Sequence, residues 1–389
     1  MKDLTVLELA SVLAGPGVGQ FFAELGAEVI KVENLKTTGD VTRSWKSSEE
    51  KTDDRSAYFC SVNWGKQSIA LDLSTAEGRE IVHRLASRSH IVIASYKPGD
   101  AEKLGVDYRT LSRQNPGLIY GQITGYGGDN PRVGYDAIIQ AESGFMFMNG
   151  EPGGRSLKMP VALMDILAGH HLKEGLLLAL LDKLQTGKGK LVEVSLIQAA
   201  VASLANQASN YLVTGQVPRK QGSAHPNIAP YGDVFMTRDG LEILLAVGTD
   251  KQFSQLINIL KISEYSQDSR FATNVLRVKN RKLLNRVLGK AIGQFAAEEL
   301  MQMLHAGKIP AGLIRNMREV LEDPGVQEMM FHDGPLRGVI TYAGRTAGAK
   351  VPHLLPPPHL GEHSRKILEE LLKMSPTDVR SLVDRGIIR

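Results

Sequence analysis

The chain has 389 residues, with 46 lysines and arginines against 42 aspartates and glutamates, and a formal net charge of +4. Its 42% hydrophobic and 23% charged residues are typical of a globular protein and exclude a disordered or fibrous one. The small basic excess lacks the clustering of a nucleic-acid-binding protein and fits small anionic ligands. This length favours two domains, or one large domain with an appendage.

Cysteine content and the N-terminus indicate where the protein works. A single cysteine, Cys60, excludes an intramolecular disulfide, and no Cys/His cluster has the spacing of a structural zinc site. The first apolar stretch is interrupted by Asp3 and Glu8, unlike a signal peptide, and no later apolar run reaches the length of a membrane span. We therefore expect a cytoplasmic protein in a reducing compartment.

Short β-branched runs alternate with helical segments along the first half of the chain. One of these helices is expected to begin after an N-cap at Ser74 or Thr75. The expected strands cover residues 4–9, 27–33, 67–73, 90–95 and 117–124. Strand and helix in regular alternation predict a doubly wound α/β fold with a parallel sheet.

The second half contains a different pattern. A largely apolar helix follows Asp165 and is expected to end near Gly187, before a strand over residues 191–196 and one further long helix. A loop rich in Pro, Gly and Asn is expected over residues 222–236, and a strand at 241–247 and amphipathic helices follow it. We expect a second, smaller domain here. Beyond it, a proline-rich crossing leads to a final helix that returns to the first domain.

A glycine-rich segment, AGPGVGQ, lies between the first strand and the first helix, and Glu33 ends the second strand, as in dinucleotide-binding folds. The spacing differs from the dinucleotide motif, because the glycines fall at positions 15, 17 and 19 and Pro16 removes an amide that would bind pyrophosphate. NAD binding is therefore disfavoured. The segment is expected to be a loop that approaches another ligand at the carboxyl ends of the strands.

The histidine pairs of the chain do not have the arrangement of a metal site. His359 and His363 are four residues apart, but Gly361 lies between them and prolines precede them, so a regular helix is disfavoured there. His170 and His171 are adjacent and would diverge by roughly 100° on a helix. We assign no metal ligand.

Asp165 is the most informative acidic residue, because it is the only acid between Glu151 and Glu174 and begins an apolar helix. Its ordinary role would be that of a helix cap. Its functional role would be that of a nucleophile, since a poorly hydrated carboxylate is reactive. Lys97 and Lys103 follow the fourth strand, where α/β folds bind phosphates, although surface lysines are usually only solvated.

Ordered blocks along nearly the whole chain resemble the class III CoA-transferase family, also called CaiB/BaiF, which includes formyl-CoA transferase and carnitine CoA-transferase. The similarity is greatest to the branch that acts on glutarate, succinate and similar dicarboxylates. The matching blocks include LAGPGVGQFFAELGAEVIKVE, GDVTRSW, YFCSVNWGKQSIALDL, YKPGDAEKLGVDY, ITGYG, GYDAIIQAESG, TGKGKLVEVSL, HPNIAPYGDVF, RFATNVLRVKNR, IPAGLIRNM and LGEHSRKIL.

The resemblance implies a Rossmann-like large domain built from both ends of the chain. Residues 1–215 would be its first part, residues 225–325 a smaller α+β domain, and residues 326–389 a linker and the return to the large domain. Two ring-shaped subunits would interlock as a homodimer. The substrates would be an acyl-CoA and a short-chain or dicarboxylic acid. No tightly bound cofactor, nucleic acid or membrane would be involved.

The resemblance also assigns roles to residues. Asp165 would be the nucleophile, forming first a mixed anhydride and then an aspartyl-CoA thioester. Two positions depart from formyl-CoA transferase: Asn34 replaces an arginine, with Lys36 as the nearest substitute, and Ser74 replaces a lysine. The residues that match the family's CoA contacts are Leu13, Ala14, Leu71, Ser95, Tyr96, Lys97, Lys103 and Tyr135.

Two alternatives remain at this point. An acyl-CoA racemase of the same fold would need a histidine base in a GHD motif, but the sequence here reads Gly134, Tyr135, Asp136, and a neutral tyrosine is a poor base at pH 7. A CoA-binding protein without turnover would be expected to lack the nucleophile, and Asp165 is present.

Overall fold

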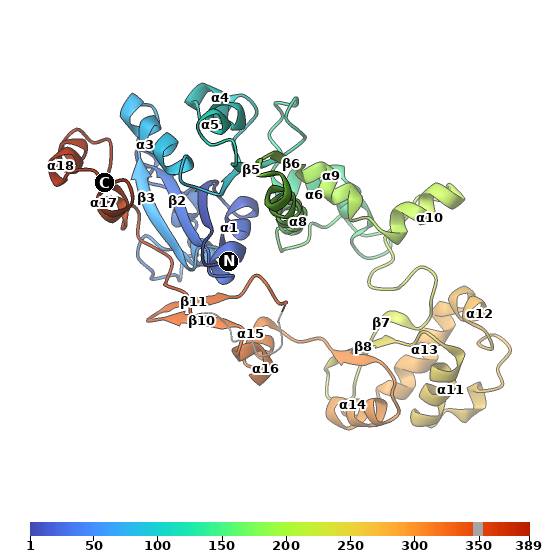
Figure 1. Ribbon diagram of the computed structural model, residues 1–389. Helices are drawn as coiled ribbons and strands as arrows, with labels where there is room; N and C mark the ends of the chain where they lie inside the picture. The colour runs from blue at the N-terminus through green and yellow to red at the C-terminus, as the bar shows by residue number, and fades with distance from the viewer. Residues whose placement is uncertain (345–352) are drawn as a thin grey trace. The chain divides into compact units, whose positions relative to one another are not determined.

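The computed structural model describes residues 1–344 and 353–389. Its contacts divide the chain into two compact units. Unit 1 comprises Met1–Phe145, Lys158–Ser209 and Pro324–Arg389, and unit 2 comprises Met146–Leu157 and Asn210–Asp323. Unit 1 thus combines both ends of the chain, as the colours of Figure 1 show. Part of the expected linker, residues 345–352, lies outside the described residues.

Unit 1 is built on a six-stranded parallel sheet with the strand order β3-β2-β1-β4-β5-β6. This is the order of doubly wound dinucleotide-binding folds, and it confirms the predicted fold class. The strands are β1 (Thr5–Leu9), β2 (Glu28–Asn34), β3 (Lys66–Leu71), β4 (Ile91–Ala94), β5 (Ile119–Thr124) and β6 (Leu191–Ser195).

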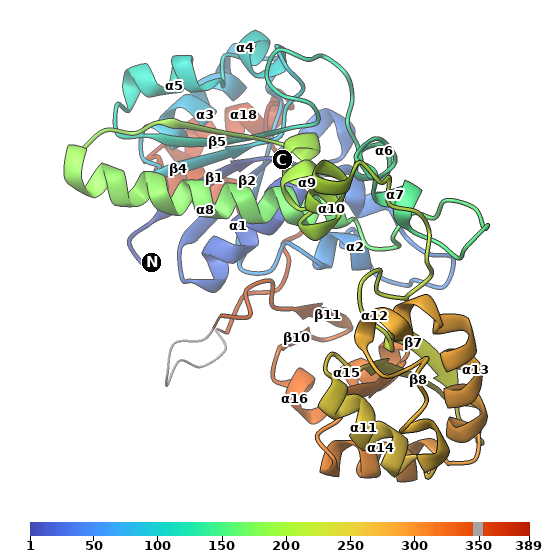
Figure 2. The same ribbon diagram turned by 90° about the vertical axis from the view of Figure 1, so that its right-hand side faces the viewer.

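Helices cover both faces of this sheet, which explains why its central strands are apolar on both sides. One core contains residues of α3, α18 and the C-terminal π-helical turn Ile367–Leu371, and the other contains residues of α1, α8 and α9 (Figure 2). The helices of unit 1 include α1 (Ala14–Glu24), α2 (Ala57–Cys60), α3 (Ala76–Ala86), α4 (Asp100–Leu104), α5 (Tyr108–Gln114), α6 (Asp136–Glu142), α8 (Leu163–Thr186), α9 (Leu196–Ala202), α16 (Pro324–Gln327), α17 (Ser364–Lys366) and α18 (Pro376–Asp384).

The glycine-rich segment differs from the expected loop, because it forms the first turns of α1. A Cβ atom at Gly15 would lie 2.4 Å from the Ala10 Cβ, and one at Gly19 would lie 1.8 Å from the Glu8 carboxylate. These two glycines therefore allow α1 to pack closely against β1 and the residue that follows it. Their role is internal packing, whereas Gly17 lines a cavity.

Helix ends follow the local chemistry of the sequence. The Thr75 hydroxyl accepts a hydrogen bond from the Gly78 amide and caps α3, and Gly187 ends α8 with a left-handed φ of 69°. The single helix expected after β6 is instead two helices, α9 and α10 (Asn206–Thr214). Among the described helices, none is both long and apolar enough to cross a membrane.

Unit 2 has its own hydrophobic core, which includes Leu256, Leu284 and Leu300. Its antiparallel sheet has the order β7-β8-β9, and only β8 was expected from the sequence. The loop predicted over residues 222–236 is wrong at its end, where β7 pairs with β8. The strands are β7 (Tyr231–Met236), β8 (Glu242–Ala246) and β9 (Ala311–Leu313), and the helices include α11 (Asp250–Ile259), α12 (Asn274–Lys279), α13 (Arg281–Ile292), α14 (Ala297–Ala306) and α15 (Met317–Leu321).

A short helix, α7 (Phe145–Met148), begins at the boundary between the units, and a hairpin of β10 (Met330–Asp333) and β11 (Leu336–Val339) belongs to unit 1.

Candidate active site

Three adjoining cavities lie beside the carboxyl ends of the unit 1 strands. The outer cavity has a volume of about 520 Å³ and includes Lys36, Asp72 and Ser74 in its lining. The middle cavity measures about 270 Å³ and includes Lys97 and Tyr135. The inner cavity measures about 500 Å³ and is mainly apolar, with Tyr58, Val62 and Val161 among its walls.

Shared residues connect the cavities in one series. The outer and middle cavities are both lined by Ser11, Val41, Ser95 and Tyr96. The middle and inner cavities are both lined by Leu13, Ala14 and Asp165. Asp165 therefore lies where a long ligand bound along the outer and middle cavities would meet a group bound in the inner one.

Asp165 is half-buried in the first turn of α8. Among the residues that the structure describes, its carboxylate has no hydrogen-bond donor and no ion-pair partner. Burial, and then the negative charge of Asp136, raise the pKa of Asp165 to about 7. A helix N-terminus favours a carboxylate by only about 0.3–1 kcal/mol at an exposed site, so desolvation and like charge dominate here. The group is a poorly stabilised carboxylate, which suits a nucleophile.

Asp136 is the acidic neighbour that the sequence analysis did not assign to the site. It is buried at the start of α6, and its two carboxylate oxygens accept hydrogen bonds from the Met164 amide and the Gln140 side chain, both at 2.8 Å. Asp136 thus holds the residue immediately before Asp165. Its position after Gly134 and Tyr135, in the GHD-like triplet, was the only signal for it in the sequence.

A strained turn presents Leu13 and Ala14 to Asp165. Val12 has a φ of 73°, a left-handed conformation that β-branched residues rarely adopt. Its amide donates to both carboxylate oxygens of Asp40 at 3.3 Å. The amide of the preceding residue, Ser11, donates to the Ser95 hydroxyl at 3.2 Å. These bonds fix the turn between β1 and α1 against the loops that follow β2 and β4.

Buried charges below the turn support it. Lys31 is fully buried, and its ammonium forms ion pairs with Glu8 and Asp40, both at 2.9 Å, and donates to the Ala10 carbonyl. On its other side, Glu8 pairs with the fully buried Lys66 at 2.7 Å. Burial acts to lower the pKa of Lys31, but the charges of Asp40 and Glu8 raise it above its usual value. The network therefore joins strands β1, β2 and β3 directly beneath the site.

The structure brings most of the predicted CoA-binding residues together along the cavities. Leu13 and Ala14 lie at the Asp165 end, Lys97 and the exposed Tyr135 line the middle cavity, and Ser95 and Tyr96 lie where the outer and middle cavities meet. Such an elongated, mostly preformed series of pockets is typical of a site for a long ligand.

Two predicted residues lie elsewhere. Leu71 is fully buried at the end of β3, and it is the following residues, Asp72 to Ser74, that line the outer cavity. Lys103 lies outside the lining of the three cavities, where its ammonium pairs with Asp100 at 3.0 Å and its side chain is 76% exposed.

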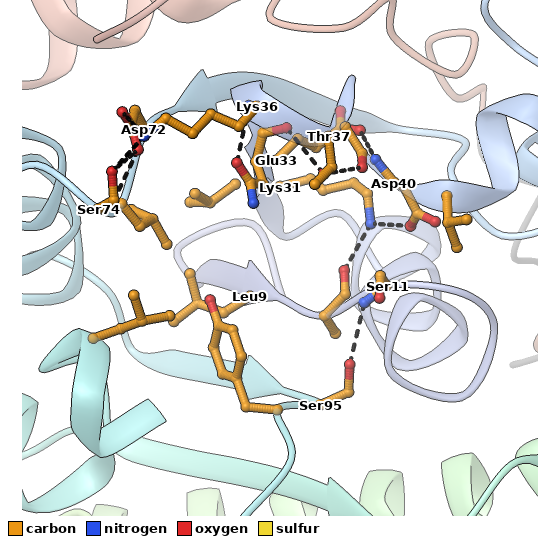
Figure 3. A pocket seen from close by; sticks show the side chains of 18 residues that line it. Leu9, Ser11, Lys31, Glu33, Lys36, Thr37, Asp40, Asp72, Ser74 and Ser95 are labelled. Carbon is orange, nitrogen blue, oxygen red and sulfur yellow. Dashed lines mark hydrogen bonds and ion pairs between the residues drawn. The ribbon is translucent and has the colours of Figure 1, made fainter. Parts of the chain in front are cut away.

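The two positions that depart from formyl-CoA transferase, Asn34 and Ser74, both line the outer cavity. Figure 3 shows Lys36 and Ser74 there. Lys36 donates to the Ser74 hydroxyl at 2.7 Å and pairs with Asp72 at 3.0 Å. The Asn34 side chain accepts from the Lys36 amide and caps the 3-10 turn Leu35–Thr37. Lys36 therefore provides an exposed cation beside the two positions where the family's arginine and lysine are absent.

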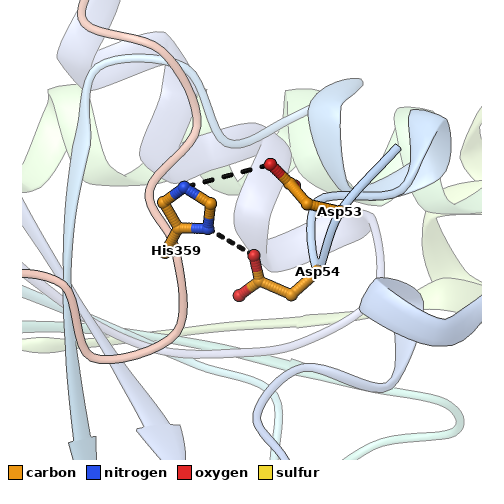
Figure 4. A group of neighbouring side chains, drawn as sticks. All are labelled: Asp53, Asp54 and His359. Carbon is orange, nitrogen blue, oxygen red and sulfur yellow. Dashed lines mark hydrogen bonds and ion pairs between the residues drawn. The ribbon is translucent and has the colours of Figure 1, made fainter. Parts of the chain in front are cut away.

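The two histidines at the C-terminal return bind different partners. The ring of His359 lies between Asp53 and Asp54, with its Nδ1 atom 2.5 Å from Asp54 (Figure 4). Asp54 also pairs with Arg43 at 3.3 Å. His363 instead accepts a hydrogen bond from the Ser68 amide at 3.3 Å. The contacts of His359 and His363 therefore attach the C-terminal segment to the N-terminal part of unit 1.

Comparisons with known proteins identify the family of this fold and site. The model of CoA-transferase family III matches residues 1–364. A succinate–glutarate CoA-transferase of Agrobacterium fabrum is 38% identical over 384 residues, which cover 95% of each protein. The human succinyl-CoA:glutarate CoA-transferase is 34% identical over 397 residues, which cover 100% of this chain and 90% of that protein.

Solved structures agree with the sequence comparisons. A CaiB/BaiF family protein from Brucella suis superposes with a TM-score of 0.84 at 39% identity, over 95% of this chain and 98% of that one. A protein from Mycobacterium tuberculosis gives a TM-score of 0.81 at 30% identity, over 93% and 97% of the two chains. The chain thus belongs to CoA-transferase family III and is a CoA-transferase, which confirms the family predicted from its sequence blocks.

Proposed function

We propose that this enzyme transfers CoA from a short dicarboxylic acyl-CoA to a free dicarboxylate, with Asp165 as the nucleophile. The observation that carries the proposal is the Asp165 carboxylate, which is half-buried, has no partner among the described residues and lies where the middle and inner cavities meet. A carboxylate without hydrogen-bond donors is less stabilised than a paired one and more ready to attack a carbonyl carbon.

The substrate class is supported by the relatives. The Agrobacterium and human proteins carry succinate and glutarate in their names, and a relative from Chloroflexus aurantiacus, 29% identical, is named for succinyl-CoA and citramalate. Each of these named acids has two carboxyl groups. Dicarboxylic acids are therefore the substrates that we propose for this enzyme.

The first half of the reaction moves CoA onto the enzyme. An Asp165 oxygen attacks the thioester carbonyl, the carbon–sulfur bond breaks, and CoA leaves as a thiolate while a mixed anhydride forms. The thiolate then attacks the Asp165 carbonyl carbon. This step breaks the anhydride, releases the donor acid as a carboxylate and leaves an aspartyl-CoA thioester.

The second half reverses these steps with the acceptor. The acceptor carboxylate attacks the Asp165 thioester and expels CoA thiolate, and the thiolate attacks the acyl carbonyl of the new anhydride. The product acyl-CoA leaves, and Asp165 returns as a carboxylate. No water, metal or redox group enters this balance, so we propose no tightly bound cofactor. The apolar walls of the inner cavity would help to keep water from the anhydride.

The remaining site residues bind CoA in this proposal. Lys97, in the middle cavity, and Lys36, in the outer one, would attract the phosphates, and the fixed turn at Leu13 and Ala14 would approach the thioester. Ser95, Tyr96 and Tyr135 would line the pantetheine path, with Leu71 beneath it and Lys103 at its edge. We further propose that the enzyme works as the interlocked homodimer of its family, in the cytoplasm.

Replacement of the nucleophile tests the proposal. Asp165→Asn keeps the size of the side chain but removes its nucleophilic oxygen, so we expect transfer from succinyl-CoA to glutarate to fall by at least roughly 1,000-fold. Binding of CoA, measured by calorimetry, should change little. Asp182→Asn is the matched control and should retain full activity, because Asp182 lies on the same helix, is partly exposed and pairs only with Lys190 among the described residues.

The alternative outcomes are distinct. Transfer at the wild-type rate in Asp165→Asn would remove Asp165 from the chemistry and contradict the proposal. Exchange of the α-proton of an acyl-CoA with solvent deuterium, without CoA transfer, would instead identify a racemase of the same fold.

A further inference from the structure

We propose that Lys173, on α8 beyond Asp165, binds the distal carboxylate of the dicarboxylic acyl group and so selects dicarboxylic over monocarboxylic substrates. This inference rests on the proposed function, because it requires the acyl carbonyl to react at Asp165. The site is the inner cavity, whose lining includes Asp165 and, further along the same helix, Lys173.

Helix α8 forms one wall of this cavity with residues on successive turns. Asp165, Gly169 and Lys173 are separated by four residues each, the spacing that places side chains on one helix face. At a rise of 1.5 Å per residue, Lys173 lies roughly 12 Å from Asp165 along the axis. Helical side chains tilt toward the N-terminus, which is the direction of Asp165 from Lys173. An extended dicarboxylic chain suits this span.

Gly169 leaves the wall open between the two charged residues. It has no side chain to fill the cavity, and a Cβ atom there would lie only 3.3 Å from the Ala14 carbonyl of α1. The lining around this part is mostly apolar, with Val62, Val161 and Ile166 as neighbours. Such walls accommodate methylene groups. The hydroxyl-bearing residues Tyr58, Ser61 and Thr341 also line the cavity, but among the lining residues Lys173 is the one with an always-basic side chain, so it is suited to hold a second carboxylate.

The Lys173 ammonium is available for a ligand. The side chain is half-buried, and burial lowers its pKa, while the nearby charge of Glu24 acts to raise it. Within the described parts of the chain it has no hydrogen-bond acceptor and no ion-pair partner, and it lies over the Phe21 ring, 5.2 Å from the ring centroid. A lysine that is partly desolvated and unpaired gains from a bound carboxylate.

Glu24, the acid nearest in charge effect to Lys173, does not form an ion pair with it, because the Glu24 oxygens already accept other hydrogen bonds. The Glu24 carboxylate accepts hydrogen bonds from the Gln20 side chain at 2.9 Å, the Thr341 amide at 2.7 Å and the Tyr342 amide at 2.9 Å. His170 lines the same cavity but is exposed, and burial and the charge of Lys173 lower its pKa. A neutral imidazole can donate one hydrogen bond to the same carboxylate, and Lys173 provides the charge.

A change of acceptor preference tests the proposal. We expect Lys173→Met to lower kcat/KM for glutarate as the acceptor by roughly 10- to 100-fold, as expected for loss of a hydrogen bond to a charged group. Transfer to butyrate, which has no distal carboxylate, should be unchanged or faster. Lys173→Arg, which keeps the charge, should restore most of the preference for glutarate.

Lys183→Met is the matched control, because Lys183 is also a half-buried lysine of α8 but lies outside the inner cavity. It should leave the glutarate-to-butyrate ratio unchanged. An equal loss with glutarate and butyrate in Lys173→Met, accompanied by a lower melting temperature, would show that Lys173 is only structural and would overturn the inference.

Failure of this inference can be separated from failure of the proposed function. Trapping of the wild-type enzyme with hydroxylamine after addition of succinyl-CoA tests Asp165 alone, because it asks only whether the Asp165 carboxylate reacts with an accepted substrate. If trapping at Asp165 occurs but Lys173→Met keeps the wild-type glutarate-to-butyrate ratio, the nucleophile stands and the distal site is wrong. If no trapping occurs in active wild-type enzyme, the proposed function itself fails.

Discussion

Unit 1 contains two kinds of buried acid within one site. Glu8, below the strands' carboxyl ends, is fully buried and pairs with both Lys31 and Lys66. Asp165, above them, is half-buried, has no partner among the described residues and has a pKa raised to about 7. Burying a charged carboxylate costs free energy at both residues. At Glu8 two lysines offset this cost, whereas no opposite charge among the described residues offsets it at Asp165.

The difference separates support from chemistry. A fully paired network holds β1, β2 and β3 together and fixes the Val12 turn through Asp40, so it provides a rigid base. Pairing Asp165 in the same way would stabilise its carboxylate and reduce its nucleophilicity. The paired network thus holds the site rigid, while the unpaired Asp165 carboxylate stays reactive and lowers the stability of the fold. Three predictions test this contrast, from the largest expected effect to the smallest.

The largest effect is expected where a paired charge loses its partner. Lys66→Met leaves one side of Glu8 unpaired in a fully buried place and should lower the free energy of unfolding by about 3–5 kcal/mol. Urea denaturation at pH 7 measures the loss. The double variant Glu8→Gln/Lys66→Met removes the opposing charge as well and should recover part of it. A loss below about 0.5 kcal/mol in the single variant would show that the pair does not support the sheet.

The opposite effect is expected at Asp165. Its pKa is about 7 in the folded protein against a usual value of 3.8, so the folded state binds this proton more tightly than the unfolded state. Stability is therefore lost as the pH rises from about 4 to 7. Asp165→Asn has no charge to bury, so it should be more stable than the wild type by about 1–2 kcal/mol at pH 8 but not at pH 4. The expected gain is smaller than the whole pKa shift would give, because water near a half-buried carboxylate reduces the cost of its burial. Urea titrations of both proteins across this range test the sign, and equal stability at pH 8 would contradict it.

The smallest effects concern the exposed lysines. Lys97 lines the middle cavity, whereas Lys103 is 76% exposed and pairs with Asp100. Lys97→Ala should therefore raise the KM for acyl-CoA roughly 3- to 10-fold with little change in kcat, and Lys103→Ala should change it less than 2-fold. Steady-state kinetics at low ionic strength make the comparison. A larger effect from Lys103 would place the CoA phosphates nearer to α4.

Much of unit 1 could be predicted from local patterns. Its parallel strands are β-branched runs separated by helices, and the Thr75 and Gly187 helix ends follow known caps. In unit 2 the strands β7 and β9 were missed, because their few residues carry no strong alternation of apolar and polar side chains. The glycines at 15 and 19 look like a ligand loop in sequence, but their purpose is contact with Ala10 and Glu8.

The site was predictable only in part, because several of its residues are positioned by partners far away in the sequence. Asp165 is conspicuous because it is alone in an apolar stretch. The bond from Val12 to Asp40 joins residues 28 positions apart, and no pattern in the sequence indicates that they are partners. Lys31 reads as the polar position of an ordinary strand, and only the fold shows that it is buried with two acids. Which charges are paired depends on residues that are distant in the sequence, and local sequence patterns do not reveal those partners.

The central claim is that the unpaired Asp165 carboxylate becomes covalently acylated during turnover. Wild-type enzyme incubated with succinyl-CoA and then hydroxylamine, digested and analysed by mass spectrometry, tests it directly. The account predicts that the peptide containing Asp165 gains the mass of a hydroxamate at that residue, and that peptides containing Asp136 or Asp182 do not. An unmodified Asp165 peptide from enzyme that is turning over, or a hydroxamate on another residue, would contradict it.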